Sequence, residues 1–371
     1  MRFAAIADRS ALKAKMIHNI REGRVPHAQL ILGPRGSGIL PLALAYATYL
    51  LCRDQQASDS CGVCPSCLQA AKLAHPDLHL HFPIYLSEGR RTCSAYVSEW
   101  RTAVLREPFL DEQLWREGLQ GENKQLRMGV DVAAEINHTL GLRAHQGGWK
   151  VILIWLPERM DAVAANKLLK SLEEPEPRTL FLMVSHDAEH LLPTILSRTQ
   201  LIKVPALSHE AVEQELLARL PDLDPKEARS VAVRSGGDLL EALALVHGGD
   251  GPVFELFRDW LRACYSLKVP ETQGYADAFH VMGRERQKGL IRYGMHAVRS
   301  GMLQGEGAGQ LVHAEGEELR FSMDLGRLLD TESTRGIHQE LEKAHAHLER
   351  NANPKVLFMD LSYRMHELLR G

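Results

Sequence analysis

The stretch LILGPRGSGILPLAL, residues 30–44, decides the fold, because it runs from a short apolar strand through a glycine-rich turn into an apolar helix. Three glycines stand where a phosphate-binding loop needs them, at Gly33, Gly36 and Gly38. Backbone amides at the start of the following helix are able to hold an anion. Ile39 and Leu40, however, occupy the positions that carry Lys and Ser or Thr in a working loop. The stretch therefore predicts a nucleotide-binding fold without its chemistry.

A second test for catalysis is the apolar run at 150–154. In ATPases, acids at the end of such a strand organise Mg²⁺ and the attacking water, whereas Trp155 and Leu156 follow the run here. Glu158 lies farther on, and we expect it to serve the dipole of the next helix. We predict no ATP hydrolysis. A passively bound nucleotide and an empty pocket both agree with the sequence.

Short apolar runs alternate with amphipathic stretches up to about residue 205, as βα units require. The runs that we expect to form strands are 29–32, 78–82, 150–154, 180–185 and 201–204. They are too apolar to be half-exposed, and they predict a parallel sheet that is covered on both faces. The fold class is α/β in this first domain, residues 1–205.

A polar stretch at about 84–128 interrupts this pattern and contains Trp100, Phe109 and Trp115. We interpret it as a small helical insertion in the first domain. Its sequence does not reveal its role.

Strand signals stop after Pro205. A small helical domain is predicted over 206–248, because Asp224-Pro225 has the features of a helix start and Gly236-Gly237 those of a helix break. Residues 248–252 read as a linker.

An all-helical C-terminal domain is predicted over 252–371. Two apolar stripes at helical spacing predict its core, and some of that core could lie between subunits. The first stripe is Ile337, Leu341, Ala344 and Leu348, and the second is Leu357, Leu361, Met365 and Leu368.

Four of the six cysteines cluster at Cys52, Cys61, Cys64 and Cys67. In a large chain without a signal peptide, such a cluster favours a metal over disulfides. Four thiolates at this spacing can close a tetrahedral, structural Zn²⁺ site. An iron–sulfur cluster and cysteines that bind nothing are the alternatives.

The composition is that of an ordinary soluble globular protein, with 45% hydrophobic and 25% charged residues. A net charge of -3 gives no global basic field for nucleic acid. A protein that reads DNA through its cysteine module is a further alternative, but residues 53–73 contain few basic side chains. No segment offers about 18 uninterrupted apolar residues, and we expect no membrane partner and a cytoplasmic location.

An arginine precedes the last expected strand, in LPTILSRT at 192–199. Taken alone, Arg198 reads as a solvated charge. An arginine finger is recognised by its placement in a partner's site rather than by its local sequence.

Several motifs occur in the order seen in bacterial clamp-loader subunits. They are HA at 27–28, GPRGSG at 33–38, the four cysteines, HPD at 75–77, AANKLLKSLEEP at 164–175 and LPTILSR at 192–198. The whole chain resembles the delta-prime subunits of DNA polymerase III clamp loaders, in the AAA+ clamp-loader family. The likeness is dense over 20–82 and 148–205 and only general in the C-terminal third.

The resemblance implies a RecA-like AAA+ domain with a zinc module, a lid domain, and a C-terminal collar that joins a pentameric loader. It implies that Arg198, with Ser197, reaches the γ-phosphate of ATP on a neighbouring gamma or tau subunit. Thr199 replaces the family's cysteine here, and Leu240 stands near the place of an arginine that the ATPase subunits carry.

The implied function is a non-hydrolysing subunit that helps to load the sliding clamp during DNA replication. Its implied partners are the gamma/tau and delta subunits and the clamp within the complex, with primed DNA contacted indirectly. The alternative is an active gamma/tau-type ATPase. The side chains at 39, 155 and 156 argue against it.

Overall fold

In the computed structural model, the chain divides into two compact units, residues 1–223 with 235–242, and residues 224–234 with 243–371. The structure describes residues 1–119, 125–145, 148–248, 250–312, 314, 316–349 and 352–370. None of the described helices combines the length and apolar character that a membrane-spanning helix needs.

The first unit is built on a parallel sheet of five strands in the order β2-β3-β4-β1-β5. The strands are β1 (Ala28–Leu32), β2 (Leu78–His81), β3 (Lys150–Trp155), β4 (Thr179–Ser185) and β5 (Gln200–Lys203). Each falls within a residue or two of its predicted run. The mixed α/β class with a parallel sheet is confirmed.

The expectation that all five strands are covered is wrong for β5. Every residue of β3 and β4 is buried, as their apolar sequences require. Strand β5 lies at the sheet edge, where Leu201 is 43% exposed. Three of its four residues are exposed, whereas β2, at the other edge of the sheet, is mostly buried.

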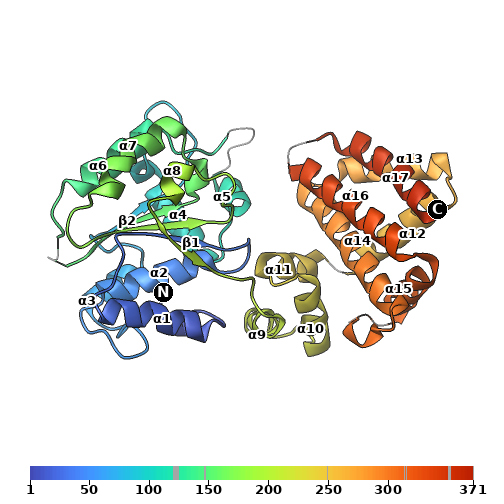
Figure 1. The fold of residues 1–371 in the computed structure, drawn as a ribbon, viewed down its shortest axis with the longest axis horizontal. Helices are drawn as coiled ribbons and strands as arrows, with labels where there is room; N and C mark the ends of the chain where they lie inside the picture. Colours follow the sequence, from blue (N-terminus) through green and yellow to red (C-terminus); the bar gives the residue numbers. More distant parts are fainter. Residues whose placement is uncertain are drawn as a thin grey trace. The chain divides into compact units, whose positions relative to one another are not determined.

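Helices cover both faces of the sheet. The elements of this unit are α1 (Ser10–Arg21), α2 (Ile39–Leu51), α3 (Pro65–Ala71), α4 (Val97–Arg106), α5 (Glu112–Gly118), α6 (Val130–Leu140), α7 (Ala162–Glu173), α8 (Pro193–Leu196) and α9 (His209–Arg219), with the 3-10 helices η1 (Phe3–Ala5), η2 (Cys93–Tyr96) and η3 (Pro157–Arg159). Helices α1, α2 and α3 lie on one face, and α6 and α7 on the opposite face (Figure 1).

The predicted insertion is helical and contains η2, α4 and α5, while residues 120–124 lie outside the described part of the chain. The core of the insertion packs against aromatic residues at the ends of β2 and β3. The Trp100 ring stacks on Phe82 with centroids 4.9 Å apart, and lies 6.2 Å from Trp155. Trp115 meets Phe82 edge-on at 5.4 Å. Trp155 thus anchors the insertion from the position where an ATPase carries an acid.

The second unit is helical throughout its described secondary structure. Its elements are α10 (Pro225–Arg234), α12 (Asp250–Tyr265), α13 (Val269–Val281), α14 (Arg284–Gly305), η4 (Gly309–Leu311), α15 (Gly316–Leu328), α16 (Thr331–Glu349) and α17 (Pro354–Arg370). Both predicted apolar stripes contribute to its core: six of the eight residues are buried, and Leu357 and Leu368 are partly buried against that core.

Between α9 and α12, the predicted helix signals hold. Helix α10 begins after Asp224, whose Oδ2 accepts hydrogen bonds from the backbone of Lys226 and Glu227. Gly236 and Gly237, both with positive φ, separate α10 from α11 (Leu239–Gly248). The linker expected at 248–252 is shorter than predicted, because α12 already begins at Asp250, and residue 249 lies outside the described residues.

Candidate functional site

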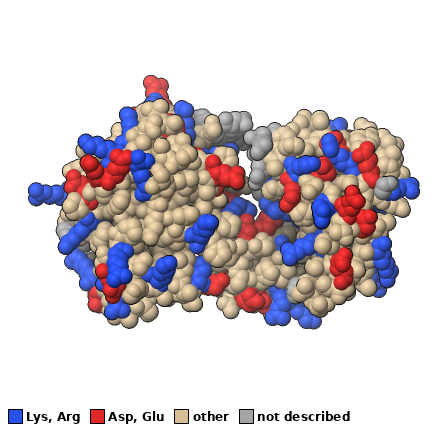
Figure 2. All heavy atoms as spheres, viewed as in Figure 1, with Lys and Arg blue, Asp and Glu red and all other residues tan. Residues whose placement is uncertain are grey.

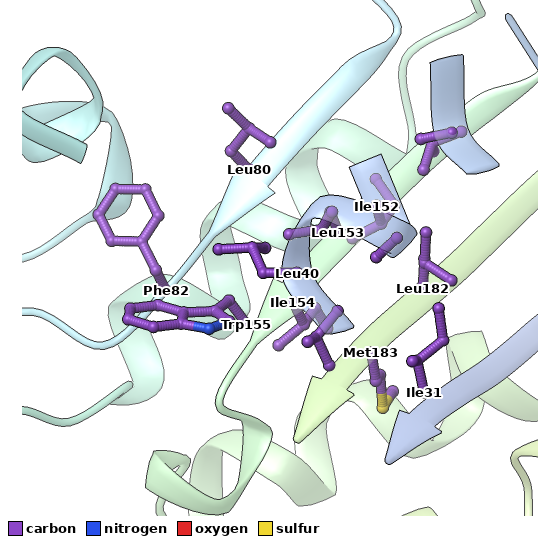
Figure 3. Close-up of a cluster of buried hydrophobic side chains, with 14 of the residues drawn as sticks. Ile31, Leu40, Leu80, Phe82, Ile152, Leu153, Ile154, Trp155, Leu182 and Met183 are labelled. Atoms are coloured by element: carbon purple, nitrogen blue, oxygen red, sulfur yellow. The ribbon is translucent and has the colours of Figure 1, made fainter. Parts of the chain in front are cut away.

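We call residues 33–38 the phosphate-binding loop after their sequence motif, and the loop lies between a strand and a helix, as the sequence predicts. It follows β1 and leads into α2, with Gly36 at φ 65° and Gly38 at φ 76°. These left-handed conformations favour glycine over other residues. Ile39 and Leu40 are each 1% exposed. Figure 3 draws Leu40 in one buried cluster with side chains of β1 to β4, and the two residues that replace the catalytic Lys and hydroxyl have become core.

Side chains of the same unit lie directly on this loop. A Cβ placed on Gly36 would lie 1.8 Å from Oδ1 of Asp238, and one on Gly38 would lie 2.8 Å from the ring of Phe109. The backbone N–H of Leu239 donates to the carbonyl of Gly36 at 3.2 Å. Phe109 comes from the insertion and Asp238 precedes α11. Two distant segments therefore cover the loop.

Arg35 holds these segments together. Its Nε donates to Oδ2 of Asp111, its Nη1 donates to Oδ2 of Asp238 at 3.0 Å, and Nη1 lies 4.0 Å from Glu241. Burial alone would lower the pKa of Arg35, but Asp238, Asp111 and Glu241 raise that pKa above its ordinary value. The loop's arginine thus pairs with carboxylates of its own chain.

The position of the missing acids is closed to solvent. Trp155 and Leu156 are buried at the end of β3. The expectation for Glu158 is wrong: Asp161 caps α7, accepting from the N–H of Ala164 at 2.7 Å.

Glu158 instead lies in η3 and faces the end of β4. Its Oε1 accepts from the N–H of His186 at 3.4 Å, and its Oε2 is buried with no hydrogen-bond partner among the described residues. Burial raises the pKa of Glu158 to about 7. The ring Nδ1 of His186 lies 3.1 Å from the carbonyl oxygen of Gly33. His186 therefore lies between Glu158 and the phosphate-binding loop and contacts both. Sequence reasoning singled out Glu158 but missed the burial of its carboxyl group, because that burial depends on strands far along the chain.

The four cysteines come together as predicted. Their sulfur atoms all lie within 4.8 Å of one another, and none is in a disulfide. Sγ of Cys61 is 3.6 Å from that of Cys52 and 3.9 Å from that of Cys67.

These separations fit a tetrahedral zinc site, because bonds of about 2.3 Å place the sulfurs about 3.8 Å apart. Backbone N–H groups of Cys61, Cys64 and Cys67 donate to sulfurs of the cluster, each at 3.4 Å. Such bonds hold thiolate ligands in place. The cluster could hold Zn²⁺ through Cys52, Cys61, Cys64 and Cys67.

Arg198 follows α8 and precedes β5, and its side chain is 32% exposed. Its Nε donates to Oε1 of Glu173 at 2.7 Å, and its Nη1 donates to the carbonyl of Thr194 at 3.0 Å and to Oγ of Ser197 at 3.2 Å. Glu173 is the last residue of α7, in the LEEP segment. The guanidinium is therefore oriented but still reachable from outside.

Leu240 is buried in α11, which starts beside the loop through Asp238 and Leu239. An apolar side chain here cannot contact a phosphate as an arginine would. On the face drawn in Figure 2, basic and acidic side chains are interspersed over both units, in keeping with the near-neutral charge.

The comparisons with known proteins agree with one another. The family described as "DNA polymerase III, delta subunit" matches residues 9–208. DNA polymerase III subunit delta' of Pseudomonas aeruginosa is 33% identical over 60% of this chain and 56% of its own length, and that of Escherichia coli is 28% identical over 71% and 66%. The tau subunit of Escherichia coli is 25% identical over 68% of this chain and 34% of its own length.

The matched part thus spans little more than half the length of the Pseudomonas relative and 66% of the Escherichia coli one. The family match covers more than half of the chain, including the loop, the four cysteines and Arg198. Its relatives include subunits delta' of DNA polymerase III, and the chain belongs to the DNA polymerase III delta subunit family.

Proposed function

We propose that this chain is a non-hydrolysing, delta-prime-like subunit of the clamp loader of a replicative DNA polymerase. It supplies an arginine finger in trans to a neighbouring ATPase subunit, and so takes part in sliding-clamp loading during DNA replication. Family membership supports the setting. The observation that carries the division of labour is the phosphate-binding loop, which is covered by Asp238 and Phe109 of its own chain.

Hydrolysis of ATP needs a cation on the β- and γ-phosphates, a hydroxyl and acids for Mg²⁺, and an oriented water. Here, the corresponding side chains are apolar and buried, and Glu158, the carboxyl group nearest in sequence to the missing acids, has a pKa raised to about 7 by burial. The space next to Gly36 already holds a carboxylate, which would repel a phosphate. This chain is therefore expected to bind ATP weakly or not at all.

Arg198 is the group that we assign to catalysis, with Ser197 as its support. In the isolated chain, the guanidinium is paired with a carboxylate on an accessible surface. A γ-phosphate on a neighbouring subunit would offer the guanidinium an anionic acceptor, as Glu173 does here. Arg198 would then stabilise the charge that develops on the transferring phosphoryl group.

The finer architecture follows from the same assignment. Residues 1–205 would form a RecA-like AAA+ domain, 206–248 its lid and 252–371 the oligomerisation collar. Zn²⁺ in the four-cysteine cluster would be structural, because all four positions are taken by protein ligands. The partners would be gamma/tau and delta subunits, with the sliding clamp and primed DNA reached through the complex, in the cytoplasm.

Reconstitution tests this assignment. The chain is purified alone and with gamma/tau and delta subunits, and ATP turnover and Mg²⁺-dependent ATP binding are measured in each preparation. We expect no turnover and no tight binding by the chain alone, and co-elution with the partners as an active loader. Turnover by the isolated chain that disappears when the 33–38 loop is altered would reverse the assignment to an active ATPase.

A further inference from the structure

A second group of metal-ligating side chains lies in the first unit, away from the four cysteines. It comprises His81 at the end of β2, Cys93 at the start of η2 and Glu135 in α6. One ligand atom from each lies within 4.8 Å of the others. The three residues come from the sheet, from the insertion and from a covering helix, so their meeting is produced by the fold.

His81 is the least satisfied member of this cluster. Its side chain is 4% exposed, and neither ring nitrogen has a hydrogen-bond partner among the residues that the structure describes. A buried imidazole without partners costs free energy, because its polar atoms have lost water and gained nothing. Nδ1 lies 3.8 Å from Oε2 of Glu135, too far for a hydrogen bond. Both ring nitrogens are therefore buried with no hydrogen bond among the described residues, and either is free to act as a ligand.

The other two ligands are already held in place. Glu135 accepts from the backbone N–H of Cys93 at 2.9 Å and from that of Ser94 at 3.0 Å. Each carboxylate oxygen still has a free lone pair after one such bond. Sγ of Cys93 accepts from the N–H of Phe82 at 3.4 Å. The same N–H to sulfur bond, at the same length, occurs three times in the four-cysteine cluster.

We propose that His81, Cys93 and Glu135 form a second metal site, for a divalent transition ion of the Zn²⁺ class. Nitrogen, sulfur and carboxylate oxygen are all zinc ligands, with bonds of about 2.0–2.3 Å. Such bonds place the ligand atoms of a tetrahedron about 3.3–3.8 Å apart, so separations of up to 4.8 Å need to shorten by about 1.5 Å at most. These three residues supply three ligands, and a water molecule would supply the fourth.

Binding at this site requires one covalent change. The Cys93 sulfur at present donates its hydrogen to the carbonyl of Phe82 at 3.3 Å. When the ion binds, that proton leaves to solvent and a metal–sulfur bond takes its place, with no oxidation or reduction. The N–H of Phe82 remains to support the thiolate.

The site gives the insertion a mechanical role. Cys93 belongs to the insertion, whereas His81 and Glu135 belong to the sheet and to α6. A bound ion would fasten the beginning of the insertion to the domain beneath it. The insertion in turn carries Phe109 and Asp111 to the phosphate-binding loop.

Metal content tests the proposal on the full-length chain. Wild type, Cys93→Ser and Glu135→Gln are equilibrated with excess Zn²⁺, desalted, and analysed for zinc per folded chain. Cys264→Ser is the matched control, because Cys264 is a buried cysteine of the second unit and no metal-ligating cluster among the described residues includes it. We expect both test variants to hold one zinc equivalent less than wild type, and the control to match wild type.

The test compares the zinc content of each variant with that of the wild type, so the result does not depend on how much of the four-cysteine cluster is occupied by zinc. Equal zinc content in wild type, Cys93→Ser and Glu135→Gln would overturn the proposal. Should Cys93→Ser fail to fold, Glu135→Gln, which keeps the shape of the side chain, decides on its own. Titration of the wild type with Co²⁺ gives a second readout: a sulfur-to-cobalt absorption band that is present in the wild type and reduced in Glu135→Gln supports the site, and identical spectra contradict it.

Discussion

Arg198 donates from Nε to Oε1 of Glu173 at 2.7 Å, across the short gap between the end of α7 and the loop before β5. The pair joins two of the motifs that carry the family resemblance. The ion pair holds the guanidinium in place and leaves the Arg198 side chain 32% exposed. An arginine that had only a structural role would gain little from this position, because exposed ion pairs contribute between about 0 and 1 kcal/mol.

Replacing this arginine should therefore separate stability from function. Arg198→Ala is expected to lower the free energy of unfolding by less than about 1 kcal/mol. In the reconstituted loader, it should depress DNA-stimulated ATP turnover at the neighbouring site by about 10³-fold or more, the range seen for arginine fingers. Turnover, clamp loading and thermal unfolding are measured together. Arg24→Ala removes another exposed arginine and should change none of them; unchanged turnover in Arg198→Ala would remove the assigned role.

The four-cysteine cluster should contribute directly to the stability of the first unit. Cys64→Ser is expected to lower the free energy of unfolding in the presence of zinc by several kcal/mol, because metal binding to a closed site is coupled to folding. The measurement is denaturant unfolding with zinc and with a chelator. Wild type should lose stability in the chelator, and the variant should respond much less. Zinc-free protein as stable as the zinc-loaded form would count against a metal at these cysteines.

Glu158 should impose a pH dependence. Burial raises the pKa of its carboxyl group to about 7 in the folded state, from 4.5. Below pH 4.5, both states are protonated and the residue has no effect. As the pH rises from 4.5 to 7, the unfolded chain loses the proton while the folded chain keeps it, so the free energy of unfolding falls, by about 3 kcal/mol from this residue.

Glu158→Gln should remove that loss and be more stable than wild type at pH 8. Chemical denaturation across this pH range measures it, with Glu22→Gln as the exposed control. A slope that Glu158→Gln leaves unchanged would contradict the assignment.

Gly36 offers a test of how tightly the loop is covered. Gly36→Ala should destabilise the chain by about 2–4 kcal/mol, because it combines the cost of a left-handed conformation with a clash against Asp238. Gly23→Ala is a matched control, with φ 67° but nothing within 4 Å of the new Cβ, and should cost only about 1 kcal/mol. Thermal or denaturant unfolding compares them. Equal losses would mean that Asp238 does not rest on the loop.

The sequence was sufficient to predict the features that are set by short stretches of the chain. Glycine spacing, apolar runs and the Asp224-Pro225 helix start each depend on neighbouring residues, and all are confirmed. Strand β5 was misjudged because an apolar run does not tell an edge from a centre.

Contacts between residues far apart in the sequence could not be predicted from local patterns. The sequence around Gly36 does not predict its contact with Asp238. The surroundings of Glu158 depend on His186, which follows another strand. His81, Cys93 and Glu135 each looked ordinary alone. Only the folded sheet and its insertion bring them within reach of one another.

The covering of the phosphate-binding loop makes the loss of nucleotide chemistry hard to reverse. Restoring Lys and Thr at Ile39 and Leu40 would place a charge and a hydroxyl in positions that are 1% exposed and packed in the core. Even then, Phe109 and Asp238 would still stand where phosphates belong, and Arg35 would have to release both carboxylates. A change at one position would therefore leave this loop covered and without the other side chains that ATP hydrolysis needs.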